Sequence, residues 1–146
     1  MGDRTWIRIT VLADQARELQ DIVGQEMSVE DDDHGHPQLY DDQANYGWYT
    51  ELEDCGHLVF EGMHGSGGEY GSCVFASAGE GTVWAACSSE GMPVAEVRED
   101  GSLDESMARA ASDYWRVYRR ARDMIERPRA ITALERSINE ERGSGS

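Results

Sequence analysis

The residues with the clearest potential for chemistry are four histidines, which are confined to one 31-residue interval of the 146-residue chain. They are His34, His36, His57 and His64. In an extended segment His34 and His36 project to the same side, where a third imidazole and a carboxylate such as Asp41 can complete a tetrahedral zinc shell. The spacing is not that of a motif such as His-Glu-x-x-His. We therefore expect exposed polar chain here, with no bound metal and no other cofactor.

A glycine-rich segment from His64 to Gly71 has the composition of a phosphate-binding loop. It lacks the last glycine of Gly-x-Gly-x-x-Gly, because position 70 is Tyr70, and it precedes an expected strand where phosphate loops precede a helix. Nucleotide binding is therefore not expected. A long connection of this kind can still line a pocket, in which His64 would act as acid or base beside Glu69. The alternative is a wide hairpin without a chemical role.

The cysteines provide neither a nucleophile nor a disulfide framework. Cys55 and His57 share one side of an extended strand, but at about 7 Å they exceed the roughly 3 Å of a catalytic hydrogen bond. With Cys73 and Cys87 the cysteines are odd in number and contain no Cys-x-x-Cys pair. The first residues lack the basic region of a signal peptide, and the longest apolar run, 83–87, is far shorter than the ~20 residues that span a bilayer. We expect a cytoplasmic protein.

The charge of the chain is strongly acidic and unevenly distributed. Twenty-nine acidic residues oppose 13 basic residues, all of them arginine, for a net charge of −16. Residues 1–107 carry −19 and residues 108–146 carry +3. Such a chain repels phosphate backbones and anionic lipid, so we expect no direct binding to nucleic acid or to a membrane. The field would attract a basic protein, although an acidic surface can also serve solubility or adaptation to high salt.

Acidic residues are densest between residues 30 and 42, close to several aromatic residues in the sequence. The aspartates would supply the long-range field that speeds association, and the aromatic side chains would supply the short-range contacts of a binding hot spot. The expected partner-binding residues are Asp31, Asp32, Asp33, Asp41, Asp42, Tyr46, Trp48 and Tyr70.

The elements that position these residues follow from the hydrophobic pattern. Residues 6–12 are rich in β-branched side chains and predict a strand, and the apolar spacing over 14–23 predicts a helix after it. Residues 25–45 lose this periodicity and are expected to form a charged loop. Alternating segments separated by glycines then predict antiparallel strands over residues 46–53, 57–63, 72–77, 82–87 and 93–98.

The pattern of the last third of the chain is helical. Ser102 and Glu105 match a capping box ahead of a long helix, and Pro128 is expected to end that helix and to begin a short one. In the short helix Ile131, Leu134 and Ile138 recur at spacings of 3 and 4. Residues 143–146 have the composition of an added linker.

Together these elements predict an α+β fold. We expect a mostly antiparallel sheet of five or six strands, with a helix after the first strand and a long C-terminal helix packed on one face. Residues 1–127 are expected to form one domain. Residues 128–142 are expected to form a terminal helix, which can join two chains into a homodimer through residues 129–142.

These features lead us to expect a non-enzymatic protein-binding module. It would present a DNA-like negative surface to a basic, nucleic-acid-handling protein and block it. An inhibitor of host defence carried by a phage or mobile element, such as an anti-CRISPR protein, would work in this way. The alternative is a small ligand-binding protein or a metal-dependent enzyme with its pocket at the glycine-rich loop around His64.

Overall fold

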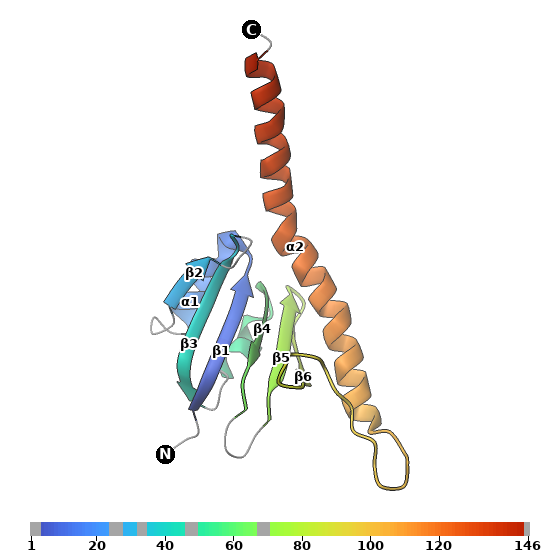
Figure 1. Cartoon of the computed structure of the whole chain (residues 1–146). Coiled ribbons are helices and arrows are strands. Elements are labelled where there is room, and N and C mark those ends of the chain that lie inside the picture. The colour runs from blue at the N-terminus through green and yellow to red at the C-terminus, as the bar shows by residue number, and fades with distance from the viewer. Residues whose placement is uncertain (1–3, 24–27, 32–34, 46–49, 67–70, 145–146) are drawn as a thin grey trace.

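The computed structural model describes residues 4–23, 28–31, 35–45, 50–66 and 71–144. These residues form the α+β fold that the sequence predicts, with a sheet between two helical layers (Figure 1). In chain order the elements are β1 (Arg4–Val11), η1 (Ala13–Gln15), α1 (Ala16–Val23), β2 (Ser28–Asp31), β3 (Pro37–Asn45), η2 (Thr50–Cys55), β4 (Val59–His64), β5 (Cys73–Ala78), β6 (Thr82–Ala86) and α2 (Glu105–Ser144), where η denotes a 3₁₀ helix.

The strands form one antiparallel sheet in the order β2-β3-β1-β4-β5-β6. Because paired residues share a face, the register aligns rows of side chains across the sheet. On the face toward α2, one row is Ser28, Tyr40, Arg8, Met63, Val74 and Ala85. The neighbouring row on this face is Glu30, Gln38, Thr10, Glu61, Ala76 and Val83.

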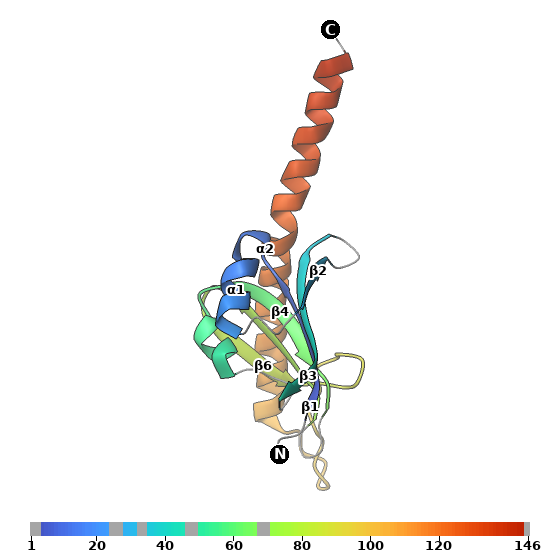
Figure 2. The same cartoon turned by 90° about the vertical axis from the view of Figure 1, so that its left-hand side faces the viewer.

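The opposite face of the sheet holds a large apolar core, which α1 and η2 cover (Figure 2). Period-two alternation directs every second residue of β1 to this face, and the apolar stripe of α1 packs against them. The rings of Phe60 and Phe75 meet edge to face within this core, with centroids 6.2 Å apart. The buried residues of the core are Ile7, Ile9, Val11, Leu19, Val23, Leu39, Leu52, Cys55, Leu58, Phe60 and Phe75.

The face toward α2 has an apolar half and a polar half. The sheet contacts of α2 are made mainly with β4, β5 and β6, where Ala76, Ala78 and Ala85 leave room for the helix to approach. The rows described above become polar on β1, β3 and β2. The apolar residues of β4, β5 and β6 therefore determine where α2 packs. The polar half of this face lies beside α2, and no described helix covers it (Figure 1).

Three expectations about the strands are wrong. A charged loop is expected over 25–45, but its described residues include the β2–β3 hairpin, because the buried Leu39 gives β3 an apolar side. Residues 50–55 form η2 instead of a strand, and the hydroxyl of Thr82 donates to the Leu52 carbonyl at 2.7 Å. Residues 93–98 contribute only isolated bridges instead of a sheet strand.

The cap and the length of α2 also differ from expectation. Asp104, instead of Ser102, caps the helix, since its Oδ1 accepts the backbone N–H of Ser106 and that of Met107, both at 3.1 Å. The helix continues through Pro128 to Ser144, so the expected separate terminal helix is wrong. A proline removes one hydrogen bond, and here the chain stays helical without it. The C-terminal half of α2 extends beyond the sheet (Figures 1 and 2). Among the described helices, none combines the length and the apolar composition that a membrane span needs.

Candidate functional site

Most of the residues expected to bind a partner lie outside the described ranges. These are Asp32, Asp33, Tyr46, Trp48 and Tyr70, together with Glu69 of the expected pocket. Asp31 ends the edge strand β2. Asp41 pairs with Ile7 in the sheet register and is half-buried on the side of α1, whereas Asp42 is exposed. The described members of the set therefore lie on two neighbouring strands of the sheet, β2 and β3.

The histidines do not assemble into a site in the described part of the chain. His36 and His64 are buried, and Nδ1 of His64 lies 2.9 Å from the carbonyl oxygen of Gly65. Burial lowers the pKa of His64, and the contact with Gly65 opposes this shift. His57 is exposed and lies 3.3 Å from Glu18. Within the described ranges, no group of three or more His, Cys, Asp or Glu residues is placed to hold a metal ion.

An exposed acidic surface extends over η1, α1 and η2. We call it the acidic layer and define it by Asp14, Glu18, Asp21, Glu51, Glu53 and Asp54, all of which are exposed. The elements α1 and η2 contact each other and lie on the same side of the sheet (Figure 2). The exposed carboxylates that they carry therefore belong to one surface. Basic side chains close to the layer are Arg17 on α1 and His57, two residues after η2. The layer thus forms a compact negative surface over the apolar core.

Carboxylates of this layer contribute to the raised pKa of Cys55. Cys55 is the last residue of η2 and is buried, and its pKa rises to about 11 because burial disfavours the thiolate. The charges of Asp54, Glu51 and Glu18 raise it further, in that order. Carboxylates from η2 and from α1 therefore act on the same point, although more than 30 residues of sequence separate them. The thiol is kept protonated, which makes it a poor nucleophile.

Several described arginines of α2 form ion pairs within the chain, mainly on the other side of the sheet. Arg120 pairs with Glu80 at 3.1 Å, and Arg122 pairs with Glu61 at 3.4 Å and with Glu126 at 2.8 Å. Arg127 pairs with Asp123 within the helix at 2.6 Å. These contacts partly neutralise the positive end of the sequence where it meets the sheet. The acidic layer lies on the opposite face of the sheet, away from these ion pairs.

A cavity of about 340 Å³ opens where the polar half of the sheet meets α2. Its walls come from β1, β3, β4 and β5, from the turn before residue 92, and from α2. The polar and aromatic lining includes Arg8, Thr10, Gln38, Glu61, Glu90, Tyr114, Trp115, Tyr118 and Arg122. The three aromatic rings of α2 lie within 5.4–5.6 Å of each other, centroid to centroid. His64 is not part of this lining, so the cavity is distinct from the pocket that the sequence suggests.

Glu61 is one of the ionisable groups in the wall of this cavity. Burial raises its pKa, and three groups oppose that rise: the Arg122 guanidinium, the Thr10 hydroxyl and, at longer range, Arg8. The negative charge of Glu61 in turn adds to the effect of burial in raising the pKa of Tyr114 and of Tyr118. The cavity therefore holds charges of both signs in a partly desolvated space, which suits a polar ligand or side chain better than an apolar one.

No protein-family model, curated protein or solved structure matches the chain. Its function therefore has to follow from the geometry and the charge of its own residues.

The acidic layer and the cavity are the two features that sequence reasoning missed. Asp14, Glu18 and Asp21 recur at spacings of 4 and 3, which marks one face of a helix, so half of the layer was readable from the sequence. The other half lies on η2, where alternation suggests a strand. The cavity depends on sheet register and on the place of α2, which no local pattern reveals.

Proposed function

We propose that the chain is a non-enzymatic binding protein that blocks a basic, nucleic-acid-handling protein. The acidic layer carries this proposal, because it places six exposed carboxylates on one surface and faces away from the arginines of α2. A surface of one sign attracts the opposite charge before contact and raises the association rate 10- to ~10³-fold at low salt. An inhibitor from a phage or mobile element would use such a surface in place of a nucleic-acid backbone.

We also propose that the protein acts in the cytoplasm. The three cysteines are free in the structure, and Cys55 is buried in the core. Free thiols of this kind suit a reducing environment. A nucleic-acid-handling partner would be found in the same compartment.

The first experiment identifies what the acidic layer attracts. The full chain is immobilised, incubated with native-host extract at low salt and washed, and bound proteins are eluted at high salt and identified by mass spectrometry. We expect a protein with an isoelectric point above about 9, and we expect duplex DNA to compete with its capture. Capture that is unaffected by salt and by duplex DNA would contradict the proposal.

A matched pair of variants then separates the layer from net charge. Glu51→Gln, Glu53→Gln and Asp54→Asn together remove three charges from the layer, and Asp113→Asn, Asp123→Asn and Glu126→Gln remove three from α2. We expect the η2 variant to associate with the captured protein about tenfold more slowly at low salt, and the α2 variant to be much less affected. Equal slowing in both would assign the effect to total charge and overturn the assignment to the layer.

A further inference from the structure

The chain between β6 and α2 forms an ordered arm, residues 88–104, at the start of α2 (Figure 1). Its base is a turn in which Ser88 N–H donates to the Met92 carbonyl at 2.9 Å and Gly91 N–H donates to the Ser88 carbonyl at 3.0 Å. The bridge between Val97 and Leu103 closes its outer part, where Asp104 N–H donates to the Glu96 carbonyl at 2.8 Å. The arm thus has a defined backbone without belonging to the sheet.

The tip of the arm is held by its polar side chains. Asp100 accepts the backbone N–H of Ser102 at 2.9 Å and its hydroxyl at 2.6 Å, and Gly101 adopts a positive φ of 88° in the same turn. The Arg98 guanidinium donates a hydrogen bond to the Leu103 carbonyl at 3.2 Å. Such a tip is already ordered before any partner arrives, which reduces the entropy lost on binding.

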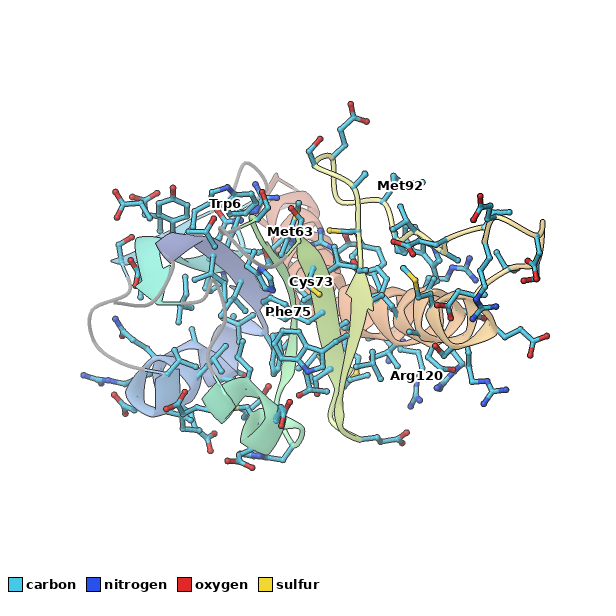
Figure 3. All side chains as sticks on the ribbon, turned by 90° about the horizontal axis from the view of Figure 1, so that it is seen from below. Trp6, Met63, Cys73, Phe75, Met92 and Arg120 are labelled. Atoms are coloured by element: carbon cyan, nitrogen blue, oxygen red, sulfur yellow. The ribbon has the colours of Figure 1, made fainter. Side chains whose placement is uncertain are left out.

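Large apolar side chains are exposed on this arm to an unusual degree. The large hydrophobic side chains that the structure describes as exposed number eight, and four of them lie in the 12 residues 92–103. Val97 is 68% exposed, Met92 56%, Leu103 46% and Val94 38%. Figure 3 shows Met92 standing out on the chain that follows β6, away from Phe75 in the core. Exposed apolar residues gathered on a rigid projection are typical of a protein interaction surface.

The charge of the arm indicates what it would contact. Residues 88–104 contain five acidic residues, Glu90, Glu96, Glu99, Asp100 and Asp104, against the single Arg98. Glu90 and Gly91 also form part of the wall of the cavity beside α2. An apolar surface with carboxylates around it complements an apolar pocket with a basic rim. A second copy of this acidic chain would meet repulsion at the same place.

We propose that the arm is the docking element of the protein, and that its exposed apolar side chains enter an apolar pocket rimmed by Lys and Arg on the basic partner. This inference rests on the proposed function and assigns the two stages of binding to different surfaces. The acidic layer increases the rate of encounter, whereas the arm holds the complex together and determines how fast it dissociates.

The test replaces one exposed valine on the arm and one elsewhere. Val97→Thr keeps the shape and the β-branching of the side chain while making it polar, and Val29→Thr makes the same change on the edge strand β2, where Val29 is 47% exposed. Both variants are measured against the basic protein captured by the full chain, at low and high salt. We expect Val97→Thr to raise the dissociation rate about five- to tenfold with little change in association rate, and Val29→Thr to behave as wild type.

The possible results separate the inference from the proposed function. If Val97→Thr dissociates like wild type while the η2 variant still associates slowly, the arm is not the docking element and the function of the acidic layer stands. If Val97→Thr and Val29→Thr dissociate equally fast, the arm has no special role. If self-association in sedimentation is abolished by Val97→Thr alone, the occupant is a second copy, which overturns the inference. Circular dichroism of each variant confirms that the fold is retained.

Discussion

At the scale of single residues, Glu61 shows how the face toward α2 combines packing with charge. Its side chain is 18% exposed and lies 3.4 Å from Arg122, itself 19% exposed. Burial nevertheless dominates and raises the pKa of Glu61 above its ordinary value of 4.5. The unfolded chain therefore releases the proton of the Glu61 carboxyl at a lower pH than the folded chain does. As the pH rises above about 4.5, Glu61 consequently lowers the free energy of unfolding.

Glu61→Gln is expected to remove that cost. Arg122 keeps Glu126 as a partner at 2.8 Å, so the substitution does not leave the guanidinium without a carboxylate. We expect the melting temperature of Glu61→Gln to exceed that of wild type at pH 8, and the difference to disappear near pH 4, where Glu61 is protonated in both states. Thermal unfolding across this pH range measures it. A variant less stable than wild type at pH 8 would show that the Arg122 ion pair outweighs desolvation.

Gly62 is required by the packing of the sheet against the core. It pairs with Ile9 and with Phe75, and a Cβ at this position would overlap the Arg8 carbonyl and lie 2.7 Å from the Phe75 ring. Gly62→Ala is therefore expected to destabilise the protein by about 1–3 kcal/mol, as overpacked cores do. Gly71→Ala is the matched control, since nothing lies within 4 Å of its Cβ position. Urea unfolding compares the two, and equal stabilities would contradict the packing account.

At the scale of elements, local patterns in the sequence predict some helices and strands, whereas tertiary contacts decide others. The apolar alternation of β4, β5 and β6 and the helical spacing of α1 and α2 predict these elements correctly. The sequence pattern does not predict the β2–β3 hairpin, because its many carboxylates outweigh the apolar signal of the buried Leu39. η2 was missed because Leu52 and Cys55 fit a helical turn as well as a strand until their contacts with α1 decide between them.

Asp104 couples the arm to α2 and is the element-scale test of the cap. Accepting hydrogen bonds from Met107 and Ser106 lowers its pKa below the ordinary 3.8, so its contribution is complete above about pH 3.8 and is lost as the pH falls through the lower folded value. Asp104→Ala is expected to lower the melting temperature by a few degrees at pH 7. Asp104→Asn retains the acceptor oxygen and should retain most of the stability. Equal loss in both variants would assign the effect to charge rather than capping.

At the scale of the whole molecule, the acidic layer and the paired arginines of α2 lie on opposite faces of the sheet, although the −19 of residues 1–107 also includes carboxylates beside α2. The acidic layer lies over one face of the sheet, and Arg120 and Arg122 of α2 lie over the other, where they pair with Glu80 and Glu61. At physiological ionic strength charges are screened over about 8 Å, so a partner meets each surface separately. Net charge alone therefore underestimates how differently the two faces interact with other molecules.

The projecting end of α2 should be separable from the folded body. The last described side chain of the helix that is buried in the core is Ile125, which packs with Val59 and Ala121. Deleting residues 128–146 is thus expected to change the free energy of unfolding by less than about 1 kcal/mol while lowering the helix signal in circular dichroism. If the truncated protein no longer unfolded cooperatively in urea, the folded domain would depend on residues 128–146 and the prediction would be wrong.

The same deletion tests pairing through residues 129–142. An isolated helix of this length is marginally stable in water, and the sequence spacing of Ile131, Leu134 and Ile138 predicts an apolar stripe that a second chain can cover. We predict that the full chain sediments at twice its mass of 16.3 kDa and that the truncated chain sediments as a single copy. Ile131→Asp with Leu134→Asp should dissociate the full-length pair without shortening the chain. A monomer both before and after truncation would exclude pairing through this helix and leave it available to a different partner.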